Sequence, residues 1–190
     1  SERQGFFPLH QIGDSNCYEP GRLSHLVAMA KWWIRRGFRL ETRNKQGFTP
    51  LARAIASHAI ELDDWIAHLR REPDAVGHWY YEHDRVAVEI LKLGADPNIL
   101  LPVTKSRRIP RGGTPLMVQR YDTPRLAEAL LRHGADPARL CSRGRTALDY
   151  ARSAARQPEK PGHQAAAEVV RLLERAIALR ARKRSRVRTA

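Results

Sequence analysis

The sequence feature that most constrains the fold is a pair of short patterns that alternate along the chain. The first pattern is a glycine followed closely by a Thr-Pro-Leu-like triplet, and it occurs in Gly5–Leu9, Gly47–Leu51, Gly112–Leu116 and Gly144–Leu148. The second is an apolar segment that runs into a glycine, and it falls between copies of the first, in Ile34–Phe38, Leu91–Asn98 and Leu131–Pro137. Such self-similarity is the signature of a repeat architecture.

Each pattern has a physical reading as one end of a helix. In the first, as at Thr114 and Pro115, the threonine hydroxyl can cap a helix and the proline suits the first helical position, which needs no amide hydrogen. In the second, as at Gly134 to Pro137, the glycine can adopt the left-handed conformation that ends a helix, and Asp-Pro begins a turn. The sequence therefore alternates helix starts with helix ends.

The spacing of the two patterns defines a repeating unit. Ten residues separate Gly37 from Gly47 and ten separate Gly134 from Gly144, which predicts a hairpin-like finger of constant length between units. Each unit has room for two short helices and cannot cover its own apolar face, so the units must stack.

These motifs resemble the ankyrin repeat over residues 4–176. The resemblance implies an all-α solenoid of helix pairs with short β-hairpin fingers, in four repeats at about 4–43, 44–108, 109–141 and 142–176. The terminal copies depart from the pattern at Phe7 and Ala147, as expected of capping repeats that face water. His10 lies where ankyrin repeats often carry a histidine that hydrogen-bonds the neighbouring finger. Gln119 and Arg120 replace small alanines, so we expect a short or displaced first helix in the third repeat.

Insertions elaborate this array. The largest, at about 58–84 in the second repeat, has helical periodicity and seven acidic residues against two arginines between Ala59 and Asp84. It contains Trp79, Tyr80 and Tyr81, which either anchor an interface or pack the insertion onto its repeat. Trp32 and Trp33 precede Gly37 in a predicted helix, where we expect core packing.

Basic residues gather on the predicted fingers and at the C-terminus. The net charge of +14 favours association with polyanions without choosing among them. Residues 177–190 contain no acid and are expected to form a basic C-terminal helix extension or tail. In ankyrin proteins partners bind the finger tips and the concave face, which implies a partner-binding set that, together with the aromatic triplet Trp79–Tyr81, comprises Arg43, Asn44, Lys45, Lys105, Arg107, Arg108, Arg139 and Arg143.

We therefore expect a protein–protein interaction module for an acidic partner, such as a bacterial immunity, antitoxin or effector protein. The alternative is nucleic-acid or anionic-membrane association through the basic finger and tail. No helix-turn-helix, zinc-finger or RNP motif supports base reading, so direct nucleic-acid binding is the less favoured interpretation.

No catalytic or metal motif is found, and we expect neither enzyme activity nor a cofactor. His78, His83 and Asp84 lack a recognised metal spacing. Cys17 and Cys141 form no CxxC pair and are expected to be buried, reduced thiols. No apolar run of eighteen residues exists, so no transmembrane segment is expected. A cytoplasmic monomer is expected, with periplasmic or secreted residence left open because residue 1 is not methionine.

Overall fold

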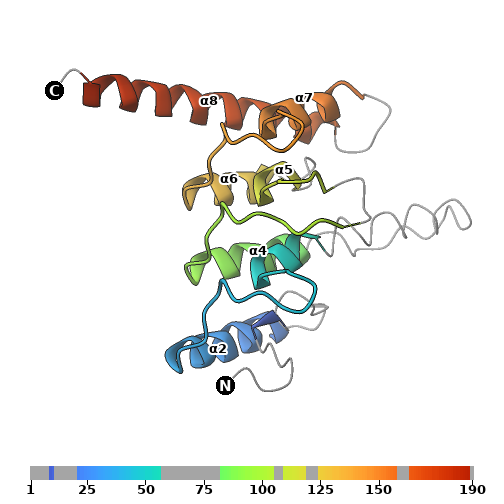
Figure 1. The fold of residues 1–190 in the computed structure, drawn as a ribbon, viewed down its shortest axis with the longest axis vertical. Helices are drawn as coiled ribbons and strands as arrows, with labels where there is room; N and C mark the ends of the chain where they lie inside the picture. Colours follow the sequence, from blue (N-terminus) through green and yellow to red (C-terminus); the bar gives the residue numbers. More distant parts are fainter. Residues whose placement is uncertain are drawn as a thin grey trace, which may run out of the picture.

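The computed structural model describes residues 9–10, 21–56, 82–104, 109–118, 124–157 and 163–188. Within them, helices are stacked in layers from the N-terminal to the C-terminal end, and loops connect one layer to the next (Figure 1). No strand is assigned in these ranges. In chain order the helices are α2 (Arg22–Arg35), an unlabelled helix at residues 50–56, α4 (Glu82–Lys92), α5 (Pro115–Val118), α6 (Pro124–Arg132), α7 (Ala147–Ala155) and α8 (His163–Arg188).

The helices form two columns. In one column α2 packs against α4, α4 against α6, and α6 against α8. In the other column α5 packs against α7, and residues 50–56 occupy the corresponding place one layer earlier. Residues 50–56 with α4, α5 with α6, and α7 with α8 thus form three described helix pairs, and this arrangement confirms the predicted all-α solenoid of ankyrin type.

The predicted helix starts are capped in two of the three described copies. Thr146 accepts a hydrogen bond from the backbone N–H of Asp149 at 3.3 Å, and the Asp149 carboxylate accepts one from the N–H of Thr146 at 2.8 Å, which completes a capping box. Thr49 accepts from the N–H of Ala52 at 3.2 Å.

The third copy behaves differently, which corrects the expectation for Thr114. Its hydroxyl oxygen is buried and has no hydrogen-bond partner within the described ranges. The N–H of Met117 bonds instead to the backbone carbonyl of Thr114 at 2.9 Å, a tighter i to i+3 turn. The described part of helix α5, Pro115–Val118, ends where the described residues stop, so the predicted short or displaced helix stays a prediction.

The helix ends follow the glycine prediction. Gly37, Gly94 and Gly134 have φ angles of 89°, 100° and 95°, in the left-handed region that only glycine adopts without strain. Each of these glycines ends the second helix of its repeat and turns the chain into a finger.

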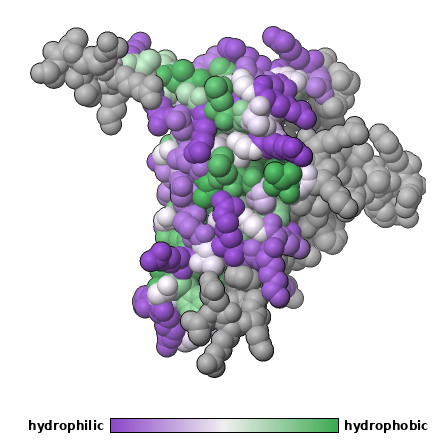
Figure 2. Space-filling view, in the orientation of Figure 1, coloured by the Kyte–Doolittle hydropathy of each residue, from purple (hydrophilic) through white to green (hydrophobic). Residues whose placement is uncertain are grey.

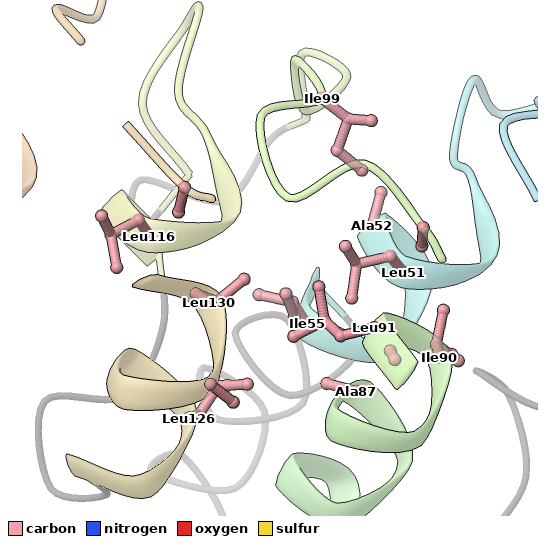
Figure 3. Close-up of a cluster of buried hydrophobic side chains, with 14 of the residues drawn as sticks. Leu51, Ala52, Ile55, Ala87, Ile90, Leu91, Ile99, Leu116, Leu126 and Leu130 are labelled. Atoms are coloured by element: carbon pink, nitrogen blue, oxygen red, sulfur yellow. The ribbon is translucent and has the colours of Figure 1, made fainter. Parts of the chain in front are cut away.

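The core lies between the layers. Leu51, Ile90, Leu91, Leu116, Leu130 and Leu173 are fully buried. Figure 3 shows Ile55 and Leu91 of the second repeat facing Leu130 of the third, so that one repeat covers the apolar face of the next. Because burial of a large aliphatic side chain contributes about 1.5–3 kcal/mol, these contacts between layers are the main source of stability.

The tryptophans of α2 correct one expectation. Trp33 is partly buried against the core, as predicted, but Trp32 is 43% exposed and the Arg36 guanidinium lies 3.4 Å from its ring centroid. Adjacent helical residues point about 100° apart, so only Trp33 lies on the face that Leu26 and Ala30 bury. The inserted segment at about 58–84 lies almost entirely outside the described residues.

Candidate binding face on the fingers

Three fingers connect the layers: the first spans residues 38–48, the second is described over 95–104 and 109–113, and the third spans 135–146. Each is closed by a hairpin-type backbone hydrogen bond. The N–H of Asn44 bonds to the carbonyl of Phe48 at 2.9 Å in the first finger. The corresponding bonds run from Leu101 to Gly113 at 2.9 Å and from Cys141 to Arg145 at 3.0 Å.

Side chains link each finger to the next. Asn98 of the second finger donates to the carbonyl of Gly134 at 3.0 Å and accepts from the N–H of Asp136 at 2.7 Å. Glu41 of the first finger accepts from the N–H of Asp96 at 2.8 Å. These bonds cross between repeats, so the three fingers form one continuous surface.

The first repeat is tied to the first finger by a buried histidine. Nε2 of His10 lies 2.6 Å from the backbone carbonyl oxygen of Phe48, and the side chain is 4% exposed. This contact confirms the role that the ankyrin resemblance implied for His10.

Three of the predicted partner-binding residues hold the fingers in shape. Arg43 donates to the carbonyl of Gly47 at 2.6 Å and to that of Leu100 at 3.1 Å. Arg139 donates to the carbonyl of Asn98 at 3.0 Å. Asn44 accepts from the N–H groups of Gln46 and Phe48, both at 3.0 Å, which shapes the tip of the first finger. The side chains of Arg43, Asn44 and Arg139 are thus engaged in hydrogen bonds within the protein.

Lys45 and Arg143 are placed differently. Both side chains are exposed at finger turns, and neither has a hydrogen bond or ion pair with any part of the chain that the structure describes. They are therefore the predicted residues best able to meet a partner. The other predicted residues, Trp79, Tyr80, Tyr81, Lys105, Arg107 and Arg108, lie outside the described residues, and their part in binding stays a prediction.

Sequence reasoning missed the apolar part of this face. Leu100, Val103 and Leu140 are 44%, 66% and 59% exposed. Leu100 and Leu140 occupy the same place in successive fingers, six residues after Gly94 and Gly134. Figure 2 shows apolar side chains among hydrophilic ones near the middle of the face viewed there. The equal spacing from the helix-ending glycines was the signal that could have found this pair.

Cys141 forms the turn of the third finger. It lies three residues before Gly144, as Asn44 lies three before Gly47, and it is free and buried. Burial by itself would raise the pKa of the Cys141 thiol. Hydrogen bonds from the Tyr150 hydroxyl, whose oxygen is 3.4 Å from the sulfur, and from the backbone N–H groups of Arg143 and Arg145 outweigh that effect and lower the pKa. The thiol thus takes the place of the Asn44 amide oxygen.

Tyr150 is the other half of this contact. Its ring centroid lies 4.3 Å from the guanidinium carbon of Arg145. Burial, followed by the hydrogen bond and charge of Cys141, raises the pKa of Tyr150. The contact between Cys141 and Tyr150 links the turn of the third finger to α7.

The described part of the chain has neither a clustered set of metal ligands nor a membrane-spanning helix. It contains no group of three or more His, Cys, Asp or Glu side chains placed to hold a metal ion. Among its helices, none combines the length and the apolar character needed to cross a bilayer.

Among known proteins, only solved structures show a similarity to this chain. No family model and no curated protein matches the sequence. A chain in the complex of a predatory endopeptidase from Bdellovibrio bacteriovorus with an immunity protein is 21% identical, over 88% of this chain and 83% of that one, with a TM-score of 0.37. The ankyrin repeat domain of Bcl-3, a member of the IkappaB family, is 20% identical, over 91% and 87%, with a TM-score of 0.34. TM-scores this low say nothing about function.

Proposed function

We propose that this ankyrin-type stack is a binding module that holds another protein on the face formed by its three fingers. The observation that carries the proposal is the pair Leu100 and Leu140, exposed at equivalent places on two fingers that Asn98 links together. Leucines exposed on a framework already ordered by hydrogen bonds lose little conformational entropy on binding.

The apolar pair supplies part of the affinity. Each leucine is about half exposed, so covering it contributes about 1 kcal/mol by the usual relation between buried apolar area and free energy. Apolar side chains surrounded by polar ones are the common anatomy of a protein interface.

The charges favour an acidic partner. Lys45 and Arg143 are exposed at the first and third fingers, Arg111 is exposed on the second, and the whole chain carries a net charge of +14. Carboxylates around an apolar patch on the partner would complement this face, raise the association rate and select against basic competitors. A bacterial immunity, antitoxin or effector role stays a prediction within this class.

The test is to capture a partner with the wild-type protein and to measure its Kd against variants. Leu100→Ser together with Leu140→Ser is expected to weaken binding about 10- to 30-fold, because about 2 kcal/mol is lost. Leu179→Ser is the matched control, since Leu179 is 58% exposed but lies on α8 and not on a finger. An unchanged Kd in the double variant would reject the finger face as the binding site.

A further inference from the structure

Helix α8 is much longer than the layer it completes. It spans 26 residues, whereas its partner α7 spans nine. Its buried side chains end at Leu173, and from Ala178 onward every side chain that the structure describes is exposed. Figure 1 shows α8 continuing past the end of α6 toward the C-terminus. We call residues 178–188 the α8 arm.

The α8 arm is anchored at its base. The Arg180 guanidinium forms an ion pair with the carboxylate of Asp136 on the third finger. This contact lies one turn beyond the half-buried Ile177, where the apolar packing of the helix ends. The arm therefore leaves the stack in a direction fixed by both packing and charge.

Beyond Arg180 every charged residue of the arm is basic. Residues 182–188 contain no acid and five basic residues, which are Arg182, Lys183, Arg184, Arg186 and Arg188. At about 100° per residue these positions surround the helix axis with no gap wider than about 120°. Like charges three and four positions apart weaken a helix, so a bound polyanion would relieve repulsion that the arm carries alone.

The placement of basic residues around the whole helix axis favours some polyanions over others as partners of the α8 arm. A helix that lies on a membrane needs one continuous apolar face, and the few apolar positions of the arm are scattered around its axis. A groove with phosphates on both walls matches charge on several sides. The major groove of B-form DNA is about 12 Å wide and admits a helix about 10–12 Å across, whereas the major groove of A-form RNA is deep and narrow.

We propose that the α8 arm is a DNA-binding element that lies in the major groove of a duplex and contacts phosphates on both walls. The contacts are to the backbone, so binding is independent of base sequence, with an expected Kd of about 10⁻⁶ to 10⁻⁴ M at physiological salt. This site is separate from the finger face and uses none of its partner-binding residues.

The experiment measures fluorescence anisotropy of a short labelled DNA duplex with the full chain at several salt concentrations. Replacing Arg182, Arg184, Arg186 and Arg188 by Gln is expected to make the slope of log affinity against log salt shallower by about 3 to 4, since each phosphate contact contributes about 0.9. A charge-matched control replaces the exposed residues Lys31, Arg39, Arg125 and Arg156 by Gln. An equal loss in both variants would overturn the proposal, because net charge alone would then explain binding.

A second pair of variants tests the helix itself. Ala181→Pro keeps every charge but breaks the helix, and it is expected to lower duplex affinity about tenfold relative to Ala181→Ser. Equal duplex affinity in these two variants would show that an unstructured basic tail is enough and would overturn the groove geometry. A duplex RNA, a single strand or vesicles of phosphatidylcholine and phosphatidylserine bound as tightly as duplex DNA would overturn it as well.

Discussion

Asn98 accepts a hydrogen bond from the backbone N–H of Asp136, 38 positions further along the chain, at 2.7 Å. The bond joins the first residues of two successive fingers, just after the glycines that end their helices. It shows that the spacing of the fingers is set by polar contacts between repeats as well as by the apolar packing of the helices.

Asn98→Ala should destabilise the fold by about 1–3 kcal/mol. The substitution removes the acceptor for Asp136 and the donor to Gly134 together, and it leaves both backbone groups without this partner. Urea denaturation followed by circular dichroism measures the change. Gln46→Ala, at an exposed position of the first finger, is the control and should leave stability within about 0.5 kcal/mol. Equal stability of the two variants would show that the bridge between fingers contributes nothing.

Thr49→Val and Thr114→Val should have different effects although the two threonines occupy the same motif position. The first removes the cap on Ala52 and should cost about 1 kcal/mol. The second removes a buried hydroxyl that has no partner in the described structure, so it should be neutral or stabilising. Thermal unfolding of the two variants checks the difference. A larger loss for the Thr114 variant would contradict it.

Cys141→Asn should be tolerated, and Cys141→Val should not. Asparagine is the residue that accepts the equivalent backbone hydrogen bonds in the first finger, at Asn44. Valine is apolar and leaves the N–H groups of Arg143 and Arg145 without their acceptor, at an expected cost of about 1–3 kcal/mol. Denaturation at neutral pH measures both variants. Equal losses would indicate that the sulfur only fills space.

The stability difference between the wild type and Cys141→Asn should increase with pH between about pH 7 and pH 9. The folded state lowers the pKa of Cys141 below that of the unfolded chain, about 8.5. The unfolded chain then holds more protons in this range, so unfolding becomes less favourable as pH rises. The raised pKa of Tyr150 acts in the opposite sense only above about pH 10, near its ordinary pKa. The measurement is urea denaturation under reducing conditions, and a difference constant with pH would refute the mechanism.

The ends of the helices could be predicted from sequence because their causes are local. Gly37 ends its helix through its own backbone conformation, and Thr146 caps the next through a side chain three residues away. The stacking of the repeats could also be predicted, because each unit alone leaves its apolar face exposed to water. Thr114 was the exception, because the N–H of Met117 bonds to its backbone carbonyl and its hydroxyl has no partner in the described ranges.

The binding face was less predictable because its contacts depend on how the repeats stack. Arg43 bonds to the carbonyl of Leu100, 57 positions away, and a sequence gives no sign of this contact. Arg43 and Arg139 therefore looked like free charges at the finger tips. Leucine is usually a core residue, whereas the path of the third finger leaves Leu140 59% exposed.

The two columns of helices have a consequence for how this molecule comes apart. Among the helices that the structure describes, the columns link each layer only to its immediate neighbours, from α2 to α4, α4 to α6 and α6 to α8. Among α2 and α4 to α8, no helix contacts another that lies two layers away. Cooperative unfolding then depends on the interfaces between neighbouring layers. A substitution that weakens a central interface can therefore let the N-terminal and C-terminal halves unfold in separate transitions.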